Sequence, residues 1–242
     1  MNWTDFDAAL LDLDGVITPT AEVHMAAWAR MFTNVLTAEG VAEPYTDADY
    51  FRYVDGKPRY DGVRAVLASR GITLPEGDPT DPPGARTVAG LGNRKNEAFN
   101  AVLERDGIAP YPGSVALLDH LGAMGVPMAV VSSSRNAPAV LDGAGLTDRF
   151  VTVVDGAVAQ REGLPGKPAP DTFLFAARIV GATPARAVVL EDATSGVAAG
   201  RAGGFGLVVG VDRGAGADAL TEAGADMVVT DLDQLVDRKG AR

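Results

Sequence analysis

Short apolar runs alternate with amphipathic segments along most of this chain. Each run is rich in Val, Leu, Ile or Ala and ends in polar or small residues, as the strands of a buried parallel sheet do. The expected strands are 8–11, 126–131, 151–154, 187–190, 207–211 and 227–229, and the expected helices between them are 113–124, 137–144, 171–180 and 194–202. This alternation predicts an α/β fold with a Rossmann-like, doubly wound parallel sheet as its core. Ligands of such folds bind beyond the carboxyl ends of the strands.

One part of the chain, residues 19–105, breaks this alternation. Its helical patterns cover 21–39, 61–70 and 96–105. It has no convincing buried strand, and prolines and glycines enforce a loop over 75–84. We therefore predict that 19–105 form an α-helical cap domain inserted after the first strand, and that 1–18 and 106–242 form the α/β core. The glycine- and alanine-rich stretch 213–218 is expected to be a surface loop.

Composition limits the classes of partner. With 242 residues and 47% hydrophobic content the chain can bury a sizeable core. Its net charge of −11 argues against a general nucleic-acid binder and against docking on anionic membranes. It has no cysteine, which excludes disulfides and thiolate metal sites. The N-terminus lacks the pattern of a signal peptide and no apolar run approaches membrane-spanning length, so the expected location is the cytoplasm.

Two carboxylates, Asp12 and Asp14, directly follow the first predicted strand, and Gly15 comes next. Side chains two residues apart on a strand share a face, so both carboxylates are expected to point the same way. Two such groups at a buried strand end repel each other, which implies a bound cation or a proton held at an unusual pKa. Mg²⁺ suits the pair, because it binds a few carboxylates together with substrate phosphate oxygens. Taken alone, these residues also fit an acidic turn or a calcium loop.

Polar residues that suit a phosphate or a metal follow other predicted strands. The hydroxyls after 126–131, with the helix that follows, suit a phosphate, although serines also cap helices routinely. A lysine stands in a proline-stiffened stretch before the helix 171–180, where it could also be a solvated surface charge. An acidic pair after 187–190 is suited to completing a metal site, and its alternative is a helix cap. The residues are Ser132, Ser133, Ser134, Arg135, Asn136, Lys167, Glu191 and Asp192.

The order of these motifs resembles the haloacid dehalogenase superfamily of phosphotransferases. Asp-x-Asp-Gly on the first strand is followed by a strand ending in Ser, then by Lys-Pro and then by Glu-Asp. The helical insertion after the first strand is where this superfamily places its cap. Within the superfamily, several stretches look like the β-phosphoglucomutase family: 12–18, 20–24, 94–96, 132–136 and 166–171. The similarity covers nearly the whole chain and is weakest in the cap loop 72–92.

The resemblance implies a role for each core residue. Asp12 would be the nucleophile that forms an aspartyl phosphate, and Asp14 would be the general acid and base. Mg²⁺ would be bound by the Asp12 carboxylate, the Asp14 backbone carbonyl, Asp192 and the phosphoryl group. The supporting residues would be Glu191 beside the metal, and Ser132 and Lys167 at the phosphoryl oxygens.

A mutase must also hold the second phosphate of a sugar bisphosphate. Arg59 in the cap, together with Ser134, Arg135 and Asn136 of the core, resembles the family's distal phosphate site. A guanidinium fork suits this task because it engages phosphate oxygens bidentately. The alternative for Arg59 is an ordinary surface charge.

His24 in the cap resembles the family's residue that couples sugar binding to cap closure and to activation of Asp14, with Lys95 close by. A histidine on an amphipathic helix can instead be a packed or capping residue. Trp28 lies four residues further on, on the same helix face, and is expected to be structural.

Three positions depart from the family pattern. Pro19 stands where the family often has an aspartate, Asp55 stands where a lysine is expected in the sugar-facing turn of the cap, and Arg135 replaces a lysine. These changes leave the phosphoryl machinery intact, so they bear on the sugar and on the mutase assignment.

The function implied by the resemblance is Mg²⁺-dependent interconversion of β-glucose 1-phosphate and glucose 6-phosphate through an aspartyl phosphate and a glucose 1,6-bisphosphate. The alternative is a sugar-phosphate phosphatase of the same superfamily, in which water replaces the sugar hydroxyl. A non-enzymatic alternative is a receiver-like switch, which accepts a phosphoryl group on an aspartate. Such a switch has no use for an acid and base two residues after that aspartate, nor for so long an insertion. The expected partner is a small sugar phosphate, with no nucleic acid and no membrane. A monomer is expected, because the cap must open and close.

Overall fold

The computed structural model describes residues 1–236 and divides the chain into two compact units. One unit, here called the core, consists of Met1–Pro19 and the chain from Ile108 onward; the other, here called the cap, is Thr20–Gly107. These bounds differ from the expected insertion, 19–105, by one residue at its start and two at its end. Within residues 1–236, no helix is long and apolar enough to cross a membrane.

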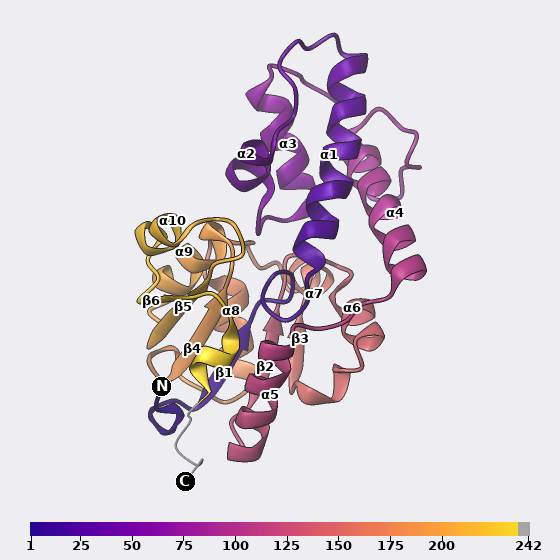
Figure 1. Ribbon diagram of the computed structural model, residues 1–242. Helices are drawn as coiled ribbons and strands as arrows, with labels where there is room; N and C mark the ends of the chain where they lie inside the picture. The colour runs from indigo at the N-terminus through magenta and orange to yellow at the C-terminus, as the bar shows by residue number, and fades with distance from the viewer. Residues whose placement is uncertain (237–242) are drawn as a thin grey trace. The chain divides into compact units, whose positions relative to one another are not determined.

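The core is built on a six-stranded sheet in the order β3-β2-β1-β4-β5-β6, with every neighbouring pair parallel (Figure 1). The strands are β1 (Ala8–Leu11), β2 (Met128–Val131), β3 (Thr152–Val154), β4 (Ala187–Glu191), β5 (Leu207–Val211) and β6 (Met227–Val229). The order runs outward in one direction from β1 to β3 and in the other from β4 to β6, so the direction of winding reverses between β1 and β4. That reversal is the switch point at which such sheets bind ligands.

Helices cover both faces of the sheet (Figure 1). They are α5 (Pro112–Met124), α6 (Ala137–Gly143), α7 (Gly156–Arg161), α8 (Asp171–Ile179), α9 (Thr194–Ala202) and α10 (Ala217–Ala223). On one face Leu10 and Val189 of the strands pack with Phe173 of α8, Val197 of α9 and Leu220 of α10 in one buried cluster. Since strand side chains alternate between faces, the remaining apolar strand positions point to the opposite face. Burial on both sides explains why the inner strands β1, β2 and β4 are nearly continuous apolar runs.

The predicted α/β fold with a doubly wound parallel sheet is confirmed, and two details of the core are corrected. Helix α7 was not predicted; it begins after Asp155, whose carboxylate accepts from the N–H groups of Ala157 at 3.1 Å and Val158 at 2.8 Å. The stretch 213–218, expected to be loop throughout, gives way to α10 at Ala217. Both helices are short, so their apolar periodicity is too brief to recognise.

The cap is helical. Its elements are α1 (Thr20–Ala38), α2 (Asp47–Asp49), the π-helical turn η2 (Tyr50–Val54), α3 (Arg59–Ser69) and α4 (Val88–Asp106). Its own buried cluster includes Trp28 and Phe32 of α1, Val63 and Val66 of α3, and Leu91 of α4.

Helix α4 starts eight residues before the predicted start at residue 96. Thr87 caps it by accepting from the Gly90 N–H at 2.9 Å. Gly90 and Gly92 weaken the helical pattern in the first turns, which is why the prediction missed them. Packing requires the second glycine, because a Cβ on Gly92 would lie 2.8 Å from the Tyr60 ring.

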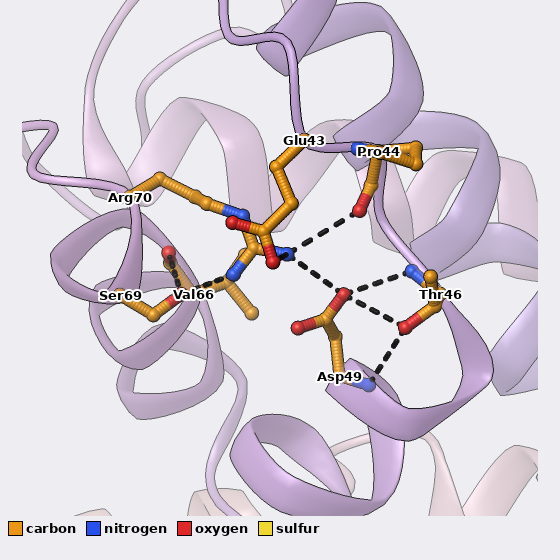
Figure 2. A network of polar contacts seen from close by, with 7 residues as sticks. All are labelled: Glu43, Pro44, Thr46, Asp49, Val66, Ser69 and Arg70. Carbon is orange, nitrogen blue, oxygen red and sulfur yellow. Dashed lines mark hydrogen bonds and ion pairs between the residues drawn. The ribbon is translucent and has the colours of Figure 1, made fainter.

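A buried ion pair ties α2 to the end of α3 (Figure 2). Arg70 Nη2 donates to Asp49 Oδ2 at 2.9 Å, and the exposed fractions of the two side chains are 5% and 11%. The same carboxylate oxygen accepts from the Thr46 N–H at 2.9 Å and the Thr46 hydroxyl at 3.0 Å. The pair therefore fixes the chain between α1 and η2 to α3.

Candidate active site

The register of the sheet brings the ends of β1, β2 and β4 to one level. Leu11 pairs with Val130 on one side and with Leu190 on the other. Asp12, the next residue, donates its N–H to the Leu190 carbonyl at 2.9 Å. Asp12 therefore lies between Val131 at the end of β2 and Glu191 at the end of β4, at the switch point of the sheet.

Lys167 binds both of these strand-end carboxylates. Its Nζ lies 2.5 Å from Asp12 Oδ1 and 2.5 Å from Glu191 Oε1, and it donates to the Val131 carbonyl at 2.9 Å. These contacts use the three N–H bonds of the ammonium. Its side chain is 1% exposed, and Nζ lies 5.0 Å from the centre of the Phe173 ring. The structure thus brings Lys167, Asp12 and Glu191, three of the predicted site residues, together at one edge of the sheet.

Glu191 is held on both of its carboxylate oxygens. Oε1 accepts from Lys167, and Oε2 accepts from the Ala193 N–H at 2.9 Å. Gly196 makes room for the group, because a Cβ there would lie 1.7 Å from Glu191 Oε1. Glu191 therefore orients Lys167 and the start of α9. Asp192, the other residue of the Glu-Asp pair, has its carboxylate against Gly15 instead.

Burial and charge set the protonation of this cluster. Burial, together with the nearby carboxylates of Glu191 and Asp14, raises the pKa of Asp12 well above its ordinary value, and the attraction of Lys167 only partly opposes this. Burial alone would lower the pKa of Lys167, but Asp12 and Glu191 together raise it above its ordinary value. Lys167 is therefore firmly charged, and one lysine does not balance the carboxylates around it.

A tight turn follows β1 and carries Asp14. Gly15 N–H donates to the Thr18 carbonyl at 2.8 Å, and Ile17 N–H donates to the Leu13 carbonyl at 2.9 Å. Gly15 has a φ of +82°, which favours glycine. A Cβ on Gly15 would also lie 1.9 Å from Asp192 Oδ2. The carboxylate of Asp192 therefore lies against the backbone directly after Asp14, so the two acidic motifs meet.

The loop after β2 is held by its own hydroxyls. Ser132 Oγ accepts from the Ser134 N–H at 3.1 Å, and Ser134 Oγ accepts from the Asn136 N–H at 3.2 Å. Arg135 Nη2 donates to Gln160 Oε1 of α7. The hydrogen bonds to Ser132 and Ser134 use the hydroxyl oxygens as acceptors, and each hydroxyl keeps an O–H that can donate. Ser132 and Ser134 thus shape the loop before α6 and do not cap that helix, whose N-cap residue Asn136 makes no side-chain capping bond. Their O–H donors remain compatible with an anion.

In the cap, Lys95 and His24 lie in contact through Lys95 Nζ and His24 Nδ1. The ammonium lies 5.1 Å from the centre of the Trp28 ring and 4.9 Å from that of Phe99. His24 stacks on Phe99 with ring centres 4.0 Å apart. Lys95 is 3% exposed, so these rings hold a buried cation. Phe99 was missed by the sequence analysis, although its position four residues after Lys95 on one helix was a usable signal.

Arg59 stands at the first position of α3, and its Nη2 donates to Asn96 Oδ1 of α4 at 2.7 Å. Asp55, one of the departures from the family pattern, ends η2 and donates its N–H to the Tyr50 carbonyl at 3.0 Å. The predicted meeting of Arg59 with Ser134, Arg135 and Asn136 involves both units and stays a prediction.

The acidic residues of the core fit a magnesium ion that is shared with a substrate. Within residues 1–236, no group of three or more acidic or histidine side chains is arranged to hold a metal ion alone. The expected set needs fewer side chains: the carboxylates of Asp12 and Asp192 with the Asp14 carbonyl. Mg²⁺ is commonly bound by one or two carboxylates, substrate phosphate and water. Burial, and after it the carboxylates of Glu191 and Asp14, raise the pKa of Asp12, and a bound cation would offset this negative charge.

The parallel sheet and the strand-end carboxylates around Lys167 define an α/β enzyme of the phosphoryl-transfer type. Residues 6–204 match the family model described as haloacid dehalogenase-like hydrolase. The chain therefore belongs to the haloacid dehalogenase-like hydrolase family.

Curated relatives and solved structures refine this placement. A β-phosphoglucomutase of Mycobacterium tuberculosis is 51% identical over 95% of this chain and 91% of its own length. Hexitol phosphatase A of Escherichia coli is 32% identical over 93% of this chain and 91% of its own length. A crystal structure of β-phosphoglucomutase from Clostridium difficile, 24% identical, covers 95% of this chain and 93% of its own with a TM-score of 0.76. That structure shares the fold.

Proposed function

We propose that the protein is a β-phosphoglucomutase that interconverts β-glucose 1-phosphate and glucose 6-phosphate. The observation that carries the phosphoryl-transfer part is the contact of Lys167 with Asp12 and Glu191 at the switch point of the sheet. The relative with 51% identity over 95% of this chain bears that name, which supports the mutase reading.

Asp12 is the proposed nucleophile. Lys167 holds its Oδ1, so the second oxygen of the carboxylate is the one that attacks phosphorus. A bond forms between this oxygen and phosphorus, and the bond from phosphorus to the sugar oxygen breaks. The product is an aspartyl phosphate, which divides the transfer into two easier steps.

Asp14 is the proposed general acid and base. In the first step its carboxylic acid gives a proton to the sugar oxygen that leaves phosphorus. In the second step its carboxylate takes the proton of the incoming sugar hydroxyl, whose oxygen attacks the aspartyl phosphate and restores Asp12. A group placed in this way typically contributes about 10²- to 10⁴-fold to the rate.

Lys167 is the proposed orienting cation, and Ser132 a proposed phosphate donor. The three N–H bonds of Lys167 are used, so it contacts a phosphoryl oxygen by exchanging one of its present partners. The hydroxyl of Ser132 can donate to a phosphoryl oxygen while it accepts from the Ser134 N–H. Both act by electrostatic stabilisation of the transferring group.

Asp12, the Asp14 carbonyl and Asp192 are the proposed ligands of Mg²⁺, and Glu191 supports them through Lys167. The ion would supply positive charge opposite the phosphoryl oxygens. This assignment is supported by the close approach of Asp192 to Gly15.

The second candidate is a sugar-phosphate phosphatase, in which water takes the place of the sugar hydroxyl. Hexitol phosphatase A of Escherichia coli, at 32% identity, motivates it. The cap favours the mutase: a buried Lys95 against His24, and Arg59 held by Asn96, suit a sugar hydroxyl and a second phosphate. A phosphatase needs neither.

A product assay separates the two candidates. Purified protein with Mg²⁺ and a catalytic amount of glucose 1,6-bisphosphate is given β-glucose 1-phosphate, and glucose 6-phosphate and inorganic phosphate are measured in parallel. The proposal expects glucose 6-phosphate in excess. Inorganic phosphate without glucose 6-phosphate would reject the mutase and retain the phosphatase; the α-anomer serves as the matched substrate control.

A further inference from the structure

The turn that carries Asp14 is held from outside by donors that are remote in sequence. Three consecutive carbonyl oxygens accept hydrogen bonds: Gly15 from Arg213 Nε at 3.1 Å, Val16 from Ser114 Oγ at 2.6 Å and Ile17 from the Tyr111 N–H at 2.9 Å. The internal bonds of the turn close it, but these external bonds fix where it lies on the core. Arg213 binds the carbonyl nearest to Asp14.

The guanidinium of Arg213 is itself fixed on several sides. It stacks over the Tyr111 ring, 3.9 Å from the ring centre, and its Nη1 donates to the Thr230 carbonyl at 2.8 Å. Its Nη2 lies 3.6 Å from Asp231 Oδ1. The side chain is 19% exposed. Because a guanidinium is planar and its donors point in fixed directions, these contacts leave Nε–H one direction, toward the Gly15 carbonyl.

Asp192 lies against the same glycine, since a Cβ on Gly15 would meet its carboxylate. Gly15 is thus in contact with a proposed metal ligand and bonded to Arg213. We propose that Arg213 is a positioning residue: by holding the Gly15 carbonyl, it sets where the Asp14 carboxylate stands relative to Asp12. This inference rests on the proposed function of Asp14 as general acid and base. Such a group must lie within hydrogen-bond reach of the proton it transfers, and a shift of about 1 Å can cost roughly 10²-fold in rate.

The test is a double-mutant cycle on kcat. Arg213→Ala is expected to lower kcat about 10- to 100-fold with KM nearly unchanged, the range typical of residues that orient a ligand through another group. In an Asp14→Asn background the same substitution should have little further effect, because the group it positions is already gone. Arg186→Ala is the matched control. Arg186, directly before β4, pairs with Asp7, directly before β1, at the edge of the sheet opposite to the site.

The deciding quantity is the ratio of the two effects of Arg213→Ala. This ratio is the fold-decrease in kcat in the native background divided by the fold-decrease in the Asp14→Asn background. A ratio above about five supports positioning, and a smaller ratio overturns it. A general loss of structure would lower kcat by the same factor in both backgrounds. If the alanine variant does not fold, Arg213→Lys takes its place in the cycle, because it keeps the charge but lacks the fixed fork.

Recording both products keeps this result separate from the proposed function. If the native protein releases only inorganic phosphate, the mutase proposal fails while the cycle is still read from phosphate release. If the native protein makes glucose 6-phosphate and the ratio is below about five, the positioning role fails alone.

Discussion

Lys167 Nζ lies 2.5 Å from Glu191 Oε1 in a site where the glutamate is fully buried. Lys167→Met would leave Glu191 and Asp12 as buried carboxylates without their shared cation. We expect it to abolish turnover and to lower the free energy of unfolding by about 3 kcal/mol at neutral pH, the usual scale for a broken buried pair. Urea unfolding followed by circular dichroism measures this. Arg186→Ala, which breaks an exposed and solvent-screened pair, should change the free energy of unfolding far less.

The deficit of Lys167→Met should also depend on pH. The pKa of Asp12 is raised in the folded protein by burial and by neighbouring carboxylates. Its ionisation therefore lowers the stability as pH rises above the pKa of Asp12 in the unfolded chain, and has no such effect at pH values below that pKa. Removing Lys167 increases this loss of stability. The difference between variant and native protein should therefore be larger at pH 8 than at pH 5; an equal difference at both would contradict the charge balance proposed for the site.

Asp14→Asn tests the general acid and base. It removes a proton-transfer group at nearly constant size, so we expect kcat to fall about 10²- to 10⁴-fold while the protein stays folded. Steady-state kinetics with thermal unfolding as a control measure this. Full activity of the variant would sink the proposed mechanism.

Gly15→Ala should disturb the metal site. The new Cβ would meet Asp192 Oδ2 at 1.9 Å, and φ at this position is +82°. Gly125, which ends α5 with a φ of +71° and has open space around it, is the matched control. Gly125→Ala should cost about 1 kcal/mol of stability and leave activity intact. Gly15→Ala should in addition weaken Mg²⁺ binding, seen as a higher metal concentration for half-maximal rate. Identical behaviour of the two variants would contradict the placement of Asp192.

The buried pair of Asp49 with Arg70 should stabilise the cap (Figure 2). Asp49→Ala should cost about 3 kcal/mol, whereas Arg64→Ala, whose partners are exposed, should cost less than about 1 kcal/mol. Trp28 lies in the cap cluster, so its fluorescence in a Trp3→Phe background reports cap unfolding.

Acid should remove this contribution. Burial alone would raise the pKa of Asp49, but hydrogen bonds from Thr46 and Arg70 outweigh it and hold that pKa below the ordinary 3.8. The stability that a lowered pKa provides is present at pH values above the pKa of the group in the unfolded chain, and it is lost as pH falls below that pKa. The difference between Asp49→Ala and the native protein should therefore shrink below about pH 4; a constant difference would show that the carboxylate charge is not what matters.

Most of the core was predictable because its strands are buried on both faces and the motifs follow their ends directly. The meeting of Asp12, Lys167 and Glu191 could be expected from the order of these motifs along the chain. What was not predictable has a physical cause. Glycines weaken the helical pattern in the first turns of α4, and α7 and α10 are too short to show a helical period of apolar residues. The contact of Arg213 with Gly15 spans 198 positions and leaves no local pattern.

The fate of the transferred phosphoryl group tests the central claim most directly. The protein is incubated with β-glucose 1-phosphate, Mg²⁺ and a trace of glucose 1,6-bisphosphate in ¹⁸O-labelled water, and the products are read by ³¹P nuclear magnetic resonance. Transfer from Asp12 to a sugar hydroxyl predicts glucose 6-phosphate without ¹⁸O. Inorganic phosphate carrying ¹⁸O as the main product would contradict it, because water would then be the acceptor.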